Sequence, residues 1–171
     1  MNAGSESKPG AVTSRTTVER TSDREVVVTR TVNGPARLVF EAFTNAELFK
    51  RWWVPKSMGM TLLSCDLDAR VGGKYRLVFD HAPEPVAFFG SYVEVQPYSR
   101  LAWTNDEGGE DGPVTTVTFE ETGGKTLVVL QERYPSKEAL DAAGTGAAEA
   151  MVETFDQLDE LMVALGESSG H

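Results

Sequence analysis

The chain has 171 residues, long enough for one domain with a core of its own. Acidic side chains outnumber basic ones by 26 to 16, which gives a formal net charge of −10. An acidic chain without a basic stripe is a poor candidate for binding nucleic acid or an anionic membrane surface. The apolar runs are only as long as strands, and the N-terminus lacks a signal-peptide pattern. We therefore expect a cytoplasmic protein with no membrane insertion.

Cysteine and histidine are too scarce for a metal site built on them. Cys65 is the single cysteine, which excludes an internal disulfide and a cysteine-clustered metal site. His81 and His171 are the only histidines, so a histidine-rich site is excluded as well. The chain also lacks a phosphate loop and a dinucleotide fingerprint. We expect no metal and no cofactor.

The N-terminal part predicts a tail, a strand and two short helices. Residues 1–23 are rich in Ser, Thr, Gly and charge and are expected to be a disordered tail that ends, at most, in an extension of the first strand. Residues 24–32 are β-branched and predict that strand. A helix is expected over 35–43, and a second from Thr44 to Trp52–Trp53, where Pro55 stops it.

Six further strands follow, separated mostly by short turns. Their expected ranges are 60–69, 74–80, 86–95, 100–104, 114–121 and 125–134. The long segment 105–113 is expected to be an exposed loop. Successive strands with short connections form an antiparallel meander, to which the first strand adds as a seventh.

The C-terminal part predicts one long amphipathic helix over 147–165. Apolar residues recur there at helical spacing, acidic residues occupy the other side, and Gly166 follows as a candidate C-cap. The expected fold is α+β, with a curved antiparallel sheet around this helix in one domain over 24–165. Residues 166–171 are then a C-terminal tail.

The aromatic residues predict a cavity between sheet and helix, although a solid core is the simpler explanation for any one of them. A long helix over a curved sheet cannot fill the whole concavity, and rings with polar edges would line the remainder. The candidate ligand-binding residues are Trp53, Phe79, Phe88, Tyr92, Trp103, Glu132, Tyr134, Met151 and Phe155.

Two titratable residues are candidates for catalysis if the protein is an enzyme. Glu132 alternates in phase with Val128 and Leu130; if that phase faces inward, its carboxylate should have a raised pKa or a partner such as Arg30 or Arg76. The alternative is that Glu132 faces water. His81 is either a polar turn residue or a ligand contact at the cavity rim.

Several segments together resemble one known superfamily. They are Pro35-Ala36-x-x-Val39-Phe40-x-Ala42-Phe43, Trp52-Trp53-x-Pro55, Asp68-x-Arg70-x-Gly72-Gly73, Gly90-x-x-x-Glu94-x-x-Pro97, Tyr134-Pro135-Ser136-Lys137-Glu138-Ala139 and Phe155-Asp156-x-Leu158-x-x-Leu161. Over residues 24–165 the chain resembles the START/Bet v-like helix-grip superfamily (SRPBCC). Within it, the chain is similar to the branch related to the C-terminal domain of the activator of the heat-shock-protein-90 ATPase.

The resemblance implies an apolar cavity that holds a hydrophobic molecule. The first hypothesis is a non-catalytic carrier or sensor of a small hydrophobic ligand such as a lipid. The second is an enzyme of polyketide cyclase, dehydratase or hydrolase type that uses Glu132 or His81. The third is a chaperone-interacting module; this is ranked last because the separate N-terminal domain of the eukaryotic co-chaperone has no counterpart before residue 24. A homodimer is left open.

Overall fold

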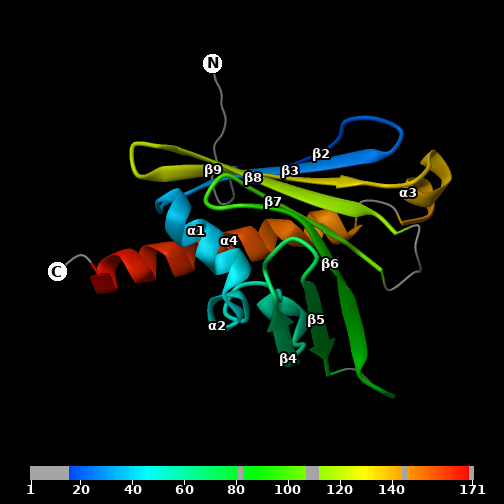
Figure 1. The fold of residues 1–171 in the computed structure, drawn as a ribbon, viewed down its shortest axis with the longest axis horizontal. Coiled ribbons are helices and arrows are strands. Elements are labelled where there is room, and N and C mark those ends of the chain that lie inside the picture. The colour runs from blue at the N-terminus through cyan, green and yellow to red at the C-terminus, as the bar shows by residue number, and fades with distance from the viewer. Residues whose placement is uncertain (1–15, 81–82, 107–111, 144–145, 170–171) are drawn as a thin grey trace.

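A computed structural model describes residues 16–80, 83–106, 112–143 and 146–169 (Figure 1). The predicted calls on His81, on residues 1–15 and on the end of the C-terminal tail fall outside the described residues. The strands are β2 (Thr17–Arg20), β3 (Glu25–Val32), β4 (Leu62–Leu67), β5 (Lys74–Phe79), β6 (Val86–Gln96), β7 (Arg100–Thr104), β8 (Val114–Thr122) and β9 (Lys125–Arg133). The helices are α1 (Ala36–Thr44), α2 (Ala46–Phe49), the 3-10 turn η2 (Lys56–Met58), α3 (Lys137–Ala143) and α4 (Gly146–Ser169).

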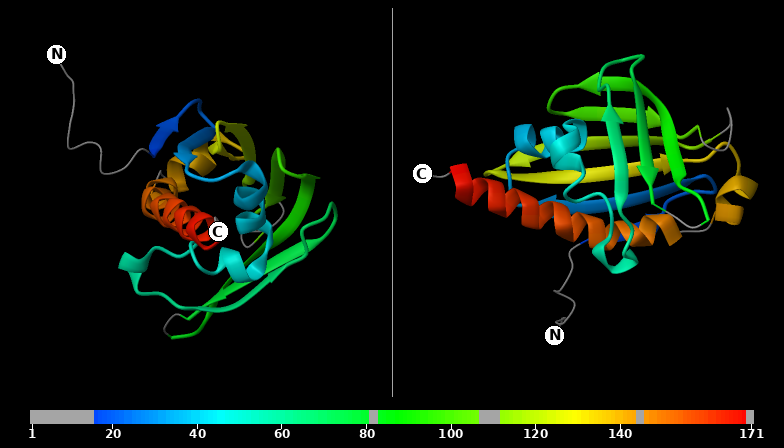
Figure 2. Two further views of the ribbon diagram at one scale, coloured as in Figure 1. Left: turned by 90° about the vertical axis from the view of Figure 1, so that its left-hand side faces the viewer. Right: turned by 90° about the horizontal axis from the view of Figure 1, so that it is seen from below.

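The strands form one antiparallel sheet of eight, in the order β2-β3-β9-β8-β7-β6-β5-β4. The sheet curves around the helices, and α4 runs along its inner side (Figure 2). The predicted α+β helix-grip fold, including the meander from β4 to β9, is confirmed. Within the described residues, no helix is long and apolar enough to cross a membrane.

The expected sheet of seven strands is one strand short. β2 lies inside the segment expected to be a disordered tail and pairs with β3, with Thr17 opposite Thr29. Val18 packs against the core, and Arg20 forms an ion pair with Asp141 at 2.8 Å. This short polar segment contains a single apolar residue, so its sequence carries little strand signal. Its conformation is decided by the pairing with β3.

Three predicted helix boundaries are wrong. The second helix begins after Asn45, whose side chain accepts a hydrogen bond from the Leu48 amide at 3.2 Å, while the Thr44 hydroxyl donates to the Phe40 carbonyl instead. That helix ends at Phe49, before the two tryptophans. At the other end of the chain, Gly166 is not a left-handed cap, because α4 continues through it to Ser169.

Helix α4 is fixed to the sheet by a buried core and by one buried cation. Phe155 and Leu158 are fully buried on its inner face. Arg30 on β3 is also buried and forms ion pairs with Asp156 and with Asp159, the latter at 3.2 Å. This arrangement fixes both the rotation and the register of α4, since a shift of either would leave a charge unpaired in the interior.

We expect Arg30→Ala to lower the free energy of unfolding by roughly 2–3 kcal/mol, because it leaves two partly buried carboxylates without their cation. Urea unfolding followed by circular dichroism measures the change. Arg133→Ala is the matched control, because Arg133 is exposed and lies 4.0 Å from Glu25; it should cost less than about 0.5 kcal/mol. Equal losses in the two variants would contradict the role assigned to Arg30.

Candidate functional site

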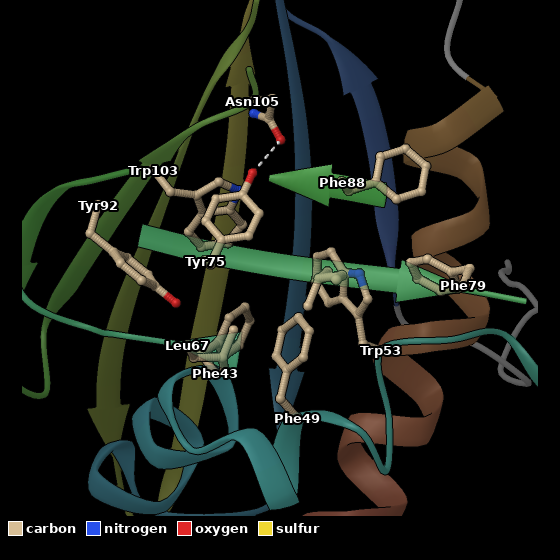
Figure 3. Close-up of a pocket in the computed structure, with 11 residues that line it drawn as sticks. Phe43, Phe49, Trp53, Leu67, Tyr75, Phe79, Phe88, Tyr92, Trp103 and Asn105 are labelled. Atoms are coloured by element: carbon tan, nitrogen blue, oxygen red, sulfur yellow. Dashed lines mark hydrogen bonds between the residues drawn. The ribbon is translucent and has the colours of Figure 1, made fainter. Parts of the chain in front are cut away.

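A cavity of two adjoining lobes lies between the sheet and the helices. The first lobe has a volume of about 240 Å³. Its walls are formed by α1, α2, the segment after α2 and the strands β4 to β7 (Figure 3). It is lined by Phe43, Phe49, Trp53, Leu67, Tyr75, Leu77, Phe79, Phe88, Tyr92, Trp103 and Asn105. Because these side chains are mostly aromatic or aliphatic, the lobe is suited to an apolar occupant.

The second lobe lies beside the N-terminal half of α4 and has a volume of about 340 Å³. It is lined by Trp53, Val54, Pro55, Met60, Phe79, Phe88, Trp103, Asn105, Thr115, Leu130, Glu132, Ala150, Met151 and Thr154. Most of the polar side chains that face the cavity are therefore in this lobe.

Four aromatic rings belong to both lobes and form the junction between them. Trp53 and Trp103 meet at 6.4 Å between ring centroids, and Phe79 and Phe88 meet at 5.5 Å, both in edge-to-face geometry. Edge-to-face pairs are the arrangement that ring quadrupoles favour. The junction is therefore built from rings that stabilise one another without filling the space beside them.

Trp53 is positioned by two polar side chains of α4. Gln157 donates hydrogen bonds to the carbonyls of Trp52 at 2.9 Å and Val54 at 2.8 Å, and it accepts one from the Lys56 amide at 2.9 Å. Glu153 accepts a bond from the Ser57 amide at 2.9 Å. The helix thereby satisfies backbone groups in the connection between α2 and η2 and in the first two residues of η2. The Ser57 hydroxyl also donates to Glu153, and this bond together with the one from the Ser57 amide holds the pKa of Glu153 below its usual value.

Asn105 closes the cavity at the β7 end. Its side-chain amide donates to the Pro113 carbonyl at 2.9 Å and to the Thr115 hydroxyl at 3.0 Å. The Tyr75 hydroxyl donates to the Thr104 carbonyl at 2.7 Å and lies 3.3 Å from the Asn105 side-chain oxygen (Figure 3). The polar groups of this wall are thus bonded within the protein.

Glu132 faces the second lobe. It follows the buried positions Val128 and Leu130 on β9, so the inward phase is the observed one. Burial raises the pKa of Glu132, and a hydrogen bond with the Tyr134 side chain opposes the rise. Burial and the neighbouring carboxylate raise the pKa of Tyr134 to about 12.

The expected arginine partners of Glu132 are wrong. Arg30 is bound to the aspartates of α4, and Arg76 is exposed on the outer face of β5. Tyr134, and not an arginine, is the partner of Glu132, because a side chain two positions further along the chain in extended backbone projects from the same face. A hydroxyl satisfies the carboxylate without supplying a positive charge.

The structure brings most of the candidate ligand-binding residues to the cavity. Trp53, Phe79, Phe88 and Trp103 line both lobes, Tyr92 lines the first, and Glu132 and Met151 line the second. Tyr134 does not line either lobe, and Phe155 is fully buried against Trp52 at 6.1 Å between ring centroids. Which of them contact a ligand stays a prediction.

Sequence reasoning missed several lining residues. Phe43 and Phe49 carry an apolar helical signal, but helical spacing alone does not separate core from cavity. Asn105 was placed in an exposed loop, and only its bonds to Pro113 and Thr115 reveal its position. Burial raises the pKa of the Cys65 thiol to about 11, which disfavours the thiolate that a nucleophilic cysteine needs. Among the residues with described positions, no three His, Cys, Asp or Glu side chains gather as they would around a metal ion.

A curved antiparallel sheet that encloses a cavity with one long terminal helix is the architecture of the helix-grip class. The sequence model of the family described as Activator of Hsp90 ATPase homolog 1-like protein matches residues 33–163. The chain belongs to this family, within the SRPBCC superfamily. A comparison with curated proteins finds no match.

Solved structures of several bacterial proteins share the fold. A protein from Rhodobacter sphaeroides is 21% identical with a TM-score of 0.79, over 88% of this chain and 99% of that one. A protein from Nitrosomonas europaea is 22% identical with a TM-score of 0.75, over 89% of this chain and 100% of that one. The AHSA1-like protein from Aeromonas hydrophila is 17% identical with a TM-score of 0.61, over 82% of this chain and 94% of that one. These similarities show the fold alone.

Gln157→Leu should lower the free energy of unfolding by about 2–3 kcal/mol, because it leaves the groups bonded to Gln157 without partners in a buried place. Urea unfolding measures the loss. Gln131→Leu, on the half-buried outer face of β9, is the matched control and should change stability by less than about 0.5 kcal/mol. The assignment fails if both variants behave alike.

Glu132→Gln should stabilise the protein more at pH 7.5 than at pH 4. Because the folded pKa of Glu132 lies above the unfolded value of 4.5, the folded state binds more protons between these two values, and wild-type stability falls as pH rises through that interval. Glu132→Gln does not lose stability in this way, because a glutamine side chain does not titrate. Melting temperatures of both proteins at the two pH values test it, with Glu120→Gln at an exposed position as control. A difference between Glu132→Gln and wild type that is the same at both pH values would contradict the prediction.

Proposed function

We propose that the protein binds one small apolar molecule in the two-lobed cavity, as a non-catalytic carrier or sensor. The observation that carries this proposal is the lining of the first lobe, where the polar groups of the described residues are the Asn105 amide, two tyrosine hydroxyls and the ring N–H groups of two tryptophans. A space with such walls gives water few partners, so an apolar ligand gains by displacing it.

The size of the cavity supports a ligand of moderate size. The two lobes share Trp53, Phe79, Phe88, Trp103 and Asn105, so one molecule can extend through both. The lobes have volumes of about 240 and 340 Å³, and only taken together do they fall well within the range of small-molecule sites, roughly 300–1,000 Å³. Lipid-like and polyketide-like molecules fit this description equally.

A second candidate function is general-base catalysis, and the inward position of Glu132 is the observation that favours it. A carboxylate with a raised pKa beside an apolar ligand has the character of a general base. Trp103 lines the same lobe and could orient a carbonyl, whereas Tyr92 lines only the first lobe. Turnover of a bound ester or ketide that is lost in Glu132→Gln would support this candidate.

Cytoplasmic location and a homodimer remain expectations from the sequence. Chaperone activation is not part of the proposal, since the third hypothesis needs a contiguous apolar surface. On the outer face of β5 and β6, the exposed Phe89 lies opposite the exposed Arg76 and so is bordered by charge.

A bulky substitution in the cavity wall tests whether the cavity is the binding site. We expect the wild type to bind the neutral fluorophore N-phenyl-1-naphthylamine, and Leu77→Trp to weaken that binding at least tenfold, because Leu77 points into the first lobe. Fluorescence titration measures both affinities.

Val93→Trp is the matched control, because Val93 is half exposed on the outer face of β6. This variant should bind the fluorophore as the wild type does. If the wild type does not bind, or if both tryptophan variants bind equally well, the proposal is wrong.

A further inference from the structure

We propose that the ligand carries a basic nitrogen, and that its ammonium group pairs with Glu132 while its apolar body lies among the aromatic rings. This inference rests on the proposed function and names the chemical class of the ligand. Glu132 is the only acidic or basic side chain among the described residues that line either lobe.

Within the described part of the chain, Glu132 forms no ion pair. Arg30 on the neighbouring strand is bound to Asp156 and Asp159, and Arg133 pairs with Glu25. The partner of Glu132 is the side chain of Tyr134, which is a hydrogen-bonding group without charge. A half-buried carboxylate satisfied only in this way still gains from a positive partner.

Several other polar groups of the walls are bonded to partners within the protein. The Asn105 amide donates to Pro113 and Thr115, and the Tyr75 hydroxyl donates to Thr104. The Thr154 hydroxyl donates to the Met151 carbonyl within α4 at 3.2 Å. Glu132 is therefore the strongest polar group that faces the ligand, and it is an acceptor. A ligand that donates from a positively charged nitrogen complements it.

The aromatic junction favours the same charge. Trp53, Trp103, Phe79 and Phe88 line the second lobe together with Glu132. Ring faces attract cations, and tryptophan does so most strongly. The formal net charge of −10 also favours the approach of a cation over that of an anion.

A matched series of small molecules with one apolar body tests this assignment. The three competitors are 4-phenylbutylamine, 4-phenyl-1-butanol and 5-phenylpentanoate, which share a 4-phenylbutyl body and differ in the polar group at its end. Each displaces N-phenyl-1-naphthylamine from the wild-type protein at fixed pH and salt. We expect the amine to bind at least tenfold more tightly than the alcohol, and the acid to bind most weakly.

Glu132→Gln should reduce the advantage of the amine over the alcohol to less than threefold, and the ratio of the two affinities within one variant is the readout. Glu120→Gln removes the same charge from an exposed position on β8 and should retain the wild-type ranking. Binding of the neutral fluorophore by both variants shows that their cavities are intact.

The inference is overturned if the alcohol or the acid binds as tightly as the amine, or if the two glutamine variants behave alike. Those results leave the proposed function standing, since the fluorophore is still bound. If the wild-type protein does not bind the fluorophore, the proposed function fails and this inference fails with it.

Discussion

The cavity depends on the way α4 is attached to only one part of the sheet. The helix packs on β2, β3 and α1, and Arg30 fixes it there through two aspartates. On its other side it reaches the segment after α2 through hydrogen bonds that Gln157 donates and one that Glu153 accepts. A single helix cannot cover eight strands, so the part of the sheet formed by β4 to β6 faces side chains across an open space.

The curvature of the sheet is the other half of this geometry. The first half of β6 pairs with β5 and its second half with β7, and Gly90 lies near the change. A Cβ atom at this position would lie 1.9 Å from the Thr104 carbonyl oxygen, so only glycine permits so close an approach of the two backbones. The same carbonyl accepts the Tyr75 hydroxyl, which ties a cavity-lining ring to the bend.

Local patterns predicted the parts of the fold that depend on neighbours in sequence. Alternation placed Tyr75, Leu77 and Phe79 on one face of β5, and all three line the first lobe. Local patterns could not predict contacts between segments that are distant in the sequence. β2 exists because β3 offers it an edge, and Trp53 faces the cavity because a glutamine more than a hundred residues later bonds to the backbone around it. Phe155 shows a further limit of prediction from sequence. The apolar face of α4 includes both residues of the solid core, such as Phe155, and residues of the cavity wall, and the pattern does not separate the two.

Glu132 is the position where the sequence departs from what stability alone would favour. Its strand phase is that of Val128 and Leu130, and an apolar residue there would avoid the cost of burying a carboxylate. Tyr134 reduces that cost with a hydrogen bond but does not remove it, because burial remains the larger effect on the pKa. Natural proteins break such local rules mainly at functional sites, where the benefit comes from a partner that the chain itself does not supply. The carboxylate therefore gives the cavity its chemical character, and the rings around it give the cavity its shape.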